Sequence, residues 1–124
     1  MSRLSICMIH GYLLTGTGSN IFVSNLVRNF CRFGHDVFLF CQEKHPEEID
    51  FVSQHSIFEP GNRKYRTQFL RETPYTGKCI LFNPEIEALL PVYVYDEYEG
   101  YKVKTFTQMK LGEIEHYIRL NVEA

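Results

Sequence analysis

Residues 4–41 decide the fold, and they read "LSICMIHGYLLTGTGSNIFVSNLVRNFCRFGHDVFLFC". The nearly continuous apolar run from Leu4 to Ile9 is typical of a β-strand that is covered on both faces. From Asn20 to Phe33 the apolar residues recur at spacings of three and four, which predicts an amphipathic helix. A second apolar run, Asp36 to Cys41, predicts another strand. Strand, helix and strand of these lengths form a βαβ unit, so the two strands should be parallel.

The ends of this helix carry recognisable signals. Ser19 or Asn20 can cap its first turn, and Gly34 lies where a helix stops. His35 follows in a Gly-His-Asp-Val turn. We interpret this histidine as structural, with its ring hydrogen-bonded to backbone in the turn.

The rest of the chain predicts further short elements and one long helix. Pro46 begins a short helical piece, and residues 59–78 form a turn-rich, mostly basic surface segment. The last helix begins near Leu111 and has no terminal glycine or polar tail. We therefore expect one domain, residues 1–124, that stops before its final strands. The predicted strands are Val52–Phe58, Cys79–Phe82, Leu89–Tyr95 with an edge or bulge at Pro91, and Tyr101–Phe106 after a turn at Glu99-Gly100.

Composition narrows the class of protein. The chain has 124 residues, of which 44% are hydrophobic and 23% charged, with a net charge of −2, so a disordered chain or a basic nucleic-acid binder is not expected. No apolar run approaches the ~18 residues of a membrane span, and no signal-peptide layout precedes His10. We expect a cytoplasmic protein. Its four cysteines lack CxxC spacing, which favours buried reduced thiols, and its five histidines form no metal constellation.

The loop from His10 to Asn20 is the candidate site. Gly16, Thr17, Gly18, Ser19 and Asn20 stand directly before the helix, where free backbone N–H groups and the positive end of the helix dipole attract anions. Glycines let a phosphate approach the backbone, and the hydroxyls add donors. A plain βα connection with a Ser or Asn cap explains the same residues, and spacing alone leaves both interpretations open.

A dinucleotide-binding fold is the nearest competitor. Gly16-x-Gly18 resembles the start of GxGxxG, and Glu43 ends the second strand, where a ribose-binding acid would lie. Two features argue against it. The third glycine position is Ile21, whose bulk should push the helix away from the sheet, and the first glycine comes seven residues after Ile9 rather than at once. A P-loop is excluded because no Gly-Lys-Ser/Thr is present.

The quoted stretch resembles the opening of a family 4 glycosyltransferase of the GT-B fold. Members of that family begin with a strand, a long glycine loop, a helix and a Gly-His-(Asp/Glu)-Val entry into the second strand. The matching residues here are Gly16, Gly18, Ser19, Asn20 and Gly34-His35-Asp36-Val37. The stretches "LLPVYVYDEYEGYKVKTF" and "EIEHYIRLNVEA" also resemble N-terminal domains of a subset of these enzymes.

The resemblance implies a Rossmann-like, three-layer α/β/α domain with a mainly parallel sheet, the N-terminal half of a GT-B enzyme. Such an enzyme transfers a sugar with retention from a nucleotide-sugar donor to an acceptor, without an essential metal. Gly16, Thr17, Gly18, Ser19 and Asn20 would meet the donor diphosphate or the acceptor, and His10 and Tyr12 would line the same cleft. The C-terminal donor domain and the family's active-site histidine are not reached, so this chain alone should be inactive and its open sheet edge should self-associate.

Two other stretches offer weaker sites. "YDEYEGYK", from Tyr95 to Lys102, sets aromatic rings beside carboxylates, as sugar-binding sites do, although a solvated hairpin turn is the favoured interpretation. The basic residues between Arg63 and Lys78 could attract an anionic acceptor or the lipid headgroups of the inner membrane face. A plain solvated loop is favoured there too.

Overall fold

The computed structural model describes residues 2–93 and 96–124, and it divides into two compact units. The first unit comprises the chain up to Asn83, and the second begins at Pro84. Each unit is described by itself below. No helix in the described residues is long and apolar enough to cross a membrane.

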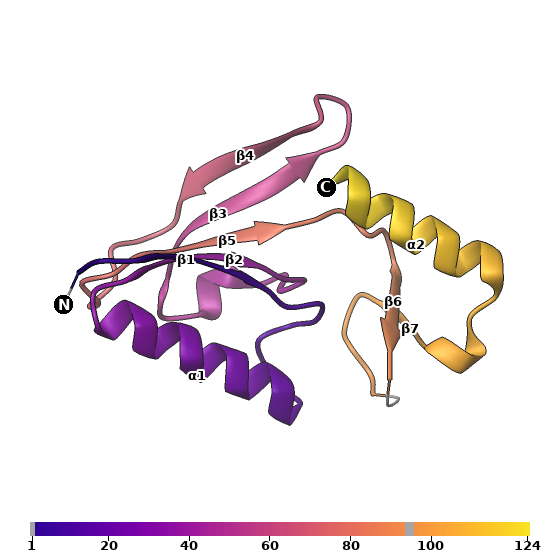
Figure 1. Cartoon of the computed structure of the whole chain (residues 1–124), viewed down its shortest axis with the longest axis horizontal. Coiled ribbons are helices and arrows are strands. Elements are labelled where there is room, and N and C mark those ends of the chain that lie inside the picture. The colour runs from indigo at the N-terminus through magenta and orange to yellow at the C-terminus, as the bar shows by residue number, and fades with distance from the viewer. Residues whose placement is uncertain (1, 94–95) are drawn as a thin grey trace. The chain divides into compact units, whose positions relative to one another are not determined.

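The first unit is built on a five-stranded, mostly parallel sheet (Figure 1). Its spatial order is β1-β2-β5-β3-β4, and all neighbouring pairs are parallel except β3 with β4. The mixed α/β class and the parallel βαβ start are therefore confirmed. The five strands are β1 (Ser5–Ile9), β2 (Asp36–Phe40), β3 (Val52–Glu59), β4 (Lys64–Phe69) and β5 (Cys79–Asn83).

Helix α1 (Gly18–Arg32) connects β1 to β2 and ends in a Schellman motif. The N–H of Gly34 donates to the Cys31 carbonyl at 3.1 Å, and the N–H of His35 donates to the Phe30 carbonyl at 3.0 Å. Gly34 takes a φ of +87°, which explains a glycine at this position. The His35 ring accepts a hydrogen bond at Nδ1 from the Leu4 N–H at 3.2 Å. His35 is thus structural, as predicted, although its partner lies before β1 and not in the turn.

The two faces of the sheet differ. On the face toward α1, Val27 and Cys31 of the helix belong to one buried apolar cluster with Val37, Leu39 and Leu81 of the strands. Strand alternation puts aromatic side chains on the opposite face, where the rings of Phe40 and Phe82 stack with centroids 4.6 Å apart. Tyr65 packs edge-on against both of them, at 6.2 and 5.3 Å. Its buried hydroxyl has no hydrogen-bond partner within the described residues.

Two predictions about the strands were wrong. β1 was expected to be covered on both faces, yet it is an edge strand and Ile9 is 85% exposed. The basic segment 59–78 was expected to be a surface loop, yet it contains β4, which forms an antiparallel hairpin with β3. β4 is exposed along most of its length because it lies at the other edge of the sheet. Its backbone pairing, rather than burial, defines it as a strand.

The second unit contains β6 (Leu89–Val92), β7 (Lys102–Thr105) and α2 (Leu111–Glu123). β6 and β7 form a two-stranded parallel pair in which Leu90 lies opposite Val103. Pro91 lies in β6, and the only strand recorded as pairing with β6 in the described residues is β7. β6 is therefore an edge strand, as predicted for the strand that contains Pro91. Residues 94 and 95, the end of the predicted strand Leu89–Tyr95, lie outside the described residues. Helix α2 is confirmed, and at its start the Glu113 carboxylate accepts the N–H of Lys110 at 3.0 Å.

The cysteines of the first unit are all unpaired thiols. Cys31, Cys41 and Cys79 are buried, as predicted. The prediction was wrong for Cys7, which is exposed because alternate side chains of β1 face solvent at the sheet edge.

Candidate functional site

The glycine-rich loop lies at the carboxyl end of the parallel strands. β1 ends at Ile9, and residues 10–17 lead from it to the first residue of α1, Gly18. Gly16 has a φ of +97°, a conformation that other residues rarely adopt. Added Cβ atoms at Gly16 and Gly18 would meet nothing within 4 Å. The backbone here is therefore open to a ligand, in the region where parallel α/β sheets commonly bind one.

Backbone and side-chain hydrogen bonds fix this loop to the end of β2. The N–H of His10 donates to the Phe40 carbonyl at 2.8 Å, and the N–H of Gln42 donates to the Tyr12 carbonyl at 2.8 Å. The Glu43 carboxylate then accepts the N–H of Leu14 at 3.0 Å. These bonds hold the first half of the loop against the strand that follows the helix.

The buried Glu43 carboxylate fixes the backbone of the loop and is not an exposed acid. It is 4% exposed, and its second oxygen accepts the N–H of His45 at 3.2 Å. Both carboxylate oxygens are thus used by backbone donors. Burial raises the pKa of the nearby Cys41 thiol to about 12, so this neighbour adds no charge at neutral pH. The Glu43 carboxylate therefore serves the loop backbone and is not presented to solvent as a ribose acceptor.

His10 and Asn20 join the two ends of the loop. The Nε2 atom of His10 lies 2.9 Å from Oδ1 of Asn20 and 3.0 Å from the Leu13 carbonyl. Since both partners are acceptors, Nε2 carries the proton. The Asn20 amide nitrogen donates in turn to the Thr15 carbonyl at 2.7 Å. The Asn20 side chain therefore fixes the backbone at Thr15, and the His10 ring fixes it at Leu13.

The first turn of α1 has backbone N–H groups without a recorded partner. Hydrogen bonds from the helix begin with the Ile21 N–H, which donates to the Thr17 carbonyl at 3.1 Å. Within the part of the chain that the structure describes, no acceptor is recorded for the N–H groups of Gly18 and Ser19, and both residues are exposed. The first turn carries no acidic residue, so no side-chain charge offsets the helix dipole there. The N-terminus of α1 can therefore bind an anion.

The structure brings the seven predicted site residues into one region but gives them different parts. Gly16, Gly18 and Ser19 present backbone to solvent, and the Thr17 and Ser19 hydroxyl oxygens lie 3.3 Å apart. Tyr12 packs edge-on against the His10 ring at 5.7 Å. Asn20 was predicted to meet a ligand or to cap the helix; its side chain is fully buried in the bonds to the loop. Helix α1 begins two residues earlier than predicted, with Thr17 as its N-cap residue.

One of the two arguments against a dinucleotide site was wrong. Ile21 was expected to push the helix away from the sheet, yet its side chain is 50% exposed and does not face the strands. The argument from loop length holds, because residues 10–17 separate β1 from α1.

Sequence reasoning missed the polar residues that end β5 and line β3. The Asn83 amide donates to the carbonyls of Cys41 and Glu43 at 2.8 and 2.9 Å, and its oxygen pairs with Nε2 of the buried His55. Asn83 therefore orders the turn from which Glu43 reaches the loop. A polar residue directly after an apolar strand is the signal that could have indicated it.

The predicted basic segment does not form one free patch. Arg71 donates to the carbonyls of Pro46 and Glu47, and Arg66 pairs with Glu59 at 3.4 Å. Arg63, at φ +52°, and Lys64 lie at the β3–β4 turn. Two of the five cations are thus engaged within the unit.

Comparison of the chain with models of known protein families, with curated proteins and with solved structures finds no match.

Proposed function

We propose that this chain is the acceptor-side domain of a retaining glycosyltransferase, and that its glycine loop receives the diphosphate of a nucleotide-sugar donor. The observation that carries the proposal is the open first turn of α1, beside the carboxyl ends of β1 and β2. There Gly18 and Ser19 are exposed, and within the described residues no acceptor is recorded for their N–H groups. The resemblance of residues 4–41 to family 4 glycosyltransferases supports the same assignment.

The proposed chemistry moves a glycosyl group from the donor phosphate to a hydroxyl of the acceptor. The bond between the anomeric carbon and the diphosphate oxygen breaks, and negative charge develops on the leaving diphosphate. N–H donors held in fixed positions stabilise such charge without reorganising, so the loop would favour departure of the diphosphate. Metal is not required in this scheme.

The braced loop supports this role better than that of a simple connector. A connector needs no fixed geometry, whereas this loop is tied at Tyr12, Leu13, Leu14 and Thr15 by four hydrogen bonds, two of them through Glu43 and Asn20. The aromatic face with Phe40 and Phe82 is where a second helical layer of a three-layer GT-B half would pack.

Binding tests this function directly. We would titrate the ¹⁵N-labelled chain with UDP, GDP, their glucose conjugates and NAD, and follow the amide resonances of residues 16–20. We expect the nucleoside diphosphates to shift Gly18, Ser19 and Asn20 and to compete with one another. Shifts with NAD alone would favour a dinucleotide site, and no shift with any ligand would reduce the loop to a connector.

A single substitution in the loop can test phosphate binding without disturbing the fold. Gly18→Val adds bulk where nothing lies within 4 Å, so the domain should fold while phosphate is blocked. Gly61→Val, in the open β3–β4 turn, is the matched control and should keep binding. Equal binding by both variants would contradict the proposed site.

A further inference from the structure

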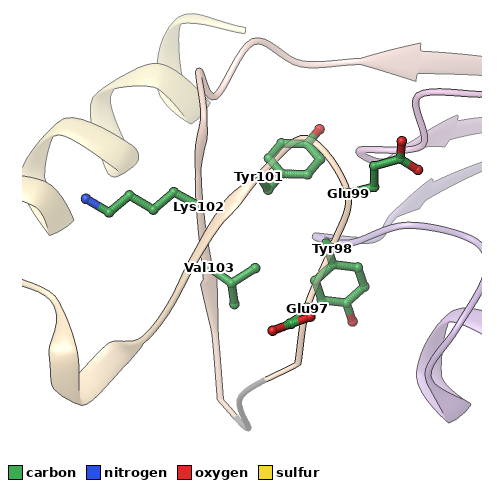
Figure 2. Close-up of a pocket in the computed structure, with 6 residues that line it drawn as sticks. All are labelled: Glu97, Tyr98, Glu99, Tyr101, Lys102 and Val103. Carbon is green, nitrogen blue, oxygen red and sulfur yellow. The ribbon is translucent and has the colours of Figure 1, made fainter.

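The second unit contains a pocket that the proposed glycine-loop site does not use. It has a volume of about 660 Å³, within the range of small-molecule sites. Figure 2 shows the side chains around it, all from the connection into β7 and from β7 itself. They are Glu97, Tyr98, Glu99, Tyr101, Lys102 and Val103.

A tight turn links the backbones of the two tyrosines. The N–H of Tyr101 donates to the Tyr98 carbonyl at 3.1 Å, and Gly100 between them has a φ of +80°. This hydrogen bond confirms the predicted turn at Glu99-Gly100. Gly100 is the third residue of the turn, the position at which a type II turn requires a positive φ. The next residue fixes the turn to the neighbouring strand, because the Lys102 N–H donates to the Ala88 carbonyl at 2.7 Å. The pocket therefore rests on a braced turn rather than on a loose loop.

The chemistry of the lining is mixed. Tyr98 and Tyr101 supply aromatic rings, Val103 supplies an apolar side chain, and Glu97 and Glu99 supply carboxylate acceptors. In Figure 2 the Lys102 ammonium extends away from both carboxylates, so it does not neutralise them. A pyranose ring has matching properties, since its C–H faces are apolar and its rim carries hydroxyl donors. A simple cation would match the carboxylates but would make no use of the apolar wall.

We propose that the pocket of residues 97–103 binds a neutral pyranose ring, packed against a tyrosine ring with its hydroxyls donated to Glu97 and Glu99. As an acceptor site of a glycosyltransferase the pocket rests on the proposed function. As a carbohydrate site it stands independently, because none of its residues belongs to the glycine loop.

The experiment uses the whole ¹⁵N-labelled chain and three probes: methyl α-D-glucopyranoside, methyl α-D-mannopyranoside and N-acetylglucosamine. We expect saturation transfer from protein to at least one sugar, with amide shifts confined to residues 97–103. Glu97→Gln should weaken binding about tenfold, the loss typical of a hydrogen bond to a charged acceptor. Tyr98→Leu should do the same while keeping apolar area.

Matched controls are present in the same unit. Glu115→Gln, on the exposed side of α2, and Tyr93→Leu, whose side chain is 83% exposed, should leave the sugar affinity unchanged. No response to any of the three sugars, up to the highest sugar concentration at which the chain stays soluble, would overturn the proposal. So would shifts of residues 97–103 by arginine, reversed by salt, without shifts by sugars, because the pocket would then be a cation site.

The UDP titration distinguishes failure of the sugar-pocket proposal from failure of the proposed glycine-loop function. Sugar binding at residues 97–103 without UDP shifts at residues 16–20 would confirm the pocket and refute its acceptor role. UDP binding without sugar binding would leave the proposed function standing and refute this pocket.

Discussion

The Nε2 proton of His10 and the Oδ1 atom of Asn20 form a 2.9 Å hydrogen bond that closes the glycine-rich loop at the end of β1. Asn20 is fully buried and also donates to the Thr15 carbonyl. The loop conformation therefore depends on a side chain that is itself shielded from solvent.

Asn20→Ala should destabilise the domain by about 1–3 kcal/mol, because it removes the amide donor of the Thr15 carbonyl and one of the two acceptors of the His10 N–H. Urea unfolding followed by circular dichroism measures this loss. The control is Asn29→Ala, on the exposed side of the same helix, which should change stability by less than about 0.5 kcal/mol. Equal stability of the two variants would show that the His10–Asn20 bond does not order the loop.

Gly77→Ala should prevent stable folding of the first unit. A Cβ atom at Gly77 would lie 1.9 Å from the His35 carbonyl oxygen, so the backbone would have to move, at a cost of about 3 kcal/mol or more. Gly61→Ala, with nothing within 4 Å, should unfold at the wild-type urea concentration. A Gly77→Ala protein with the wild-type midpoint would contradict the close approach of these two segments.

Thiol labelling should distinguish the exposed Cys7 from the three buried cysteines. Burial raises the pKa of Cys31 to about 11 and that of Cys41 to about 12, and it raises the pKa of Cys79 well above its usual value. Since only the thiolate reacts, a disulfide reagent at pH 8 should modify Cys7 within minutes and the others only after unfolding in urea. In Cys7→Ser the fast phase should disappear; a remaining fast phase would place a second thiol at the surface.

Acid should weaken the link between the chain start and β2. Arg3 holds Asp36 through two hydrogen bonds of 2.6 and 2.7 Å, and this contact lowers the pKa of the Asp36 carboxyl. A lowered folded-state pKa contributes stability above the unfolded-state pKa of about 4, and that contribution is lost as the pH falls through the folded value. Asp36→Asn should therefore lower the urea midpoint at pH 7 and have a smaller effect at pH 3. An equal effect at both pH values would assign the loss to packing.

The exposed edge at β1 should promote self-association. β1 ends the sheet and exposes Ile9, so its unpaired backbone can pair with a second chain. Light scattering after size exclusion should show dimers whose fraction rises with protein concentration, and Ile9→Lys should restore the monomer without loss of stability. A monodisperse wild-type monomer at every concentration would refute this prediction.

The sequence predicted those parts of the fold that carry local apolar patterns. β1 and β2 were found from their continuous apolar runs, and α1 and α2 from apolar residues that recur at helical spacing. β4 was missed because Lys64, Arg66 and Gln68 alternate along an exposed edge, so pairing defines the strand without any apolar run. The position of β5 between β2 and β3 depends on contacts between distant segments, and no local pattern encodes it.

The residues of the candidate site were likewise predicted only in part. The residues facing solvent, Gly16 to Ser19, were predicted from their types and their place before a helix. Glu43 and Asn83 act through backbone groups more than 25 residues away in the sequence, so their roles became visible only in three dimensions. A buried acid that braces a loop has the same sequence appearance as an exposed acid that binds ribose.

The strand order has a consequence for synthesis of this chain. β5 lies between β2 and β3, yet it is the last strand of the sheet to be made. A nascent chain released only as far as Lys78 therefore holds two separate pieces, the β1-α1-β2 unit and the β3–β4 hairpin, with no hydrogen-bonded strand between them. Each piece then exposes an inner edge to the crowded surroundings of the ribosome. Chaperone capture or ribosome pausing near this point would affect the yield of folded protein more than at any earlier codon.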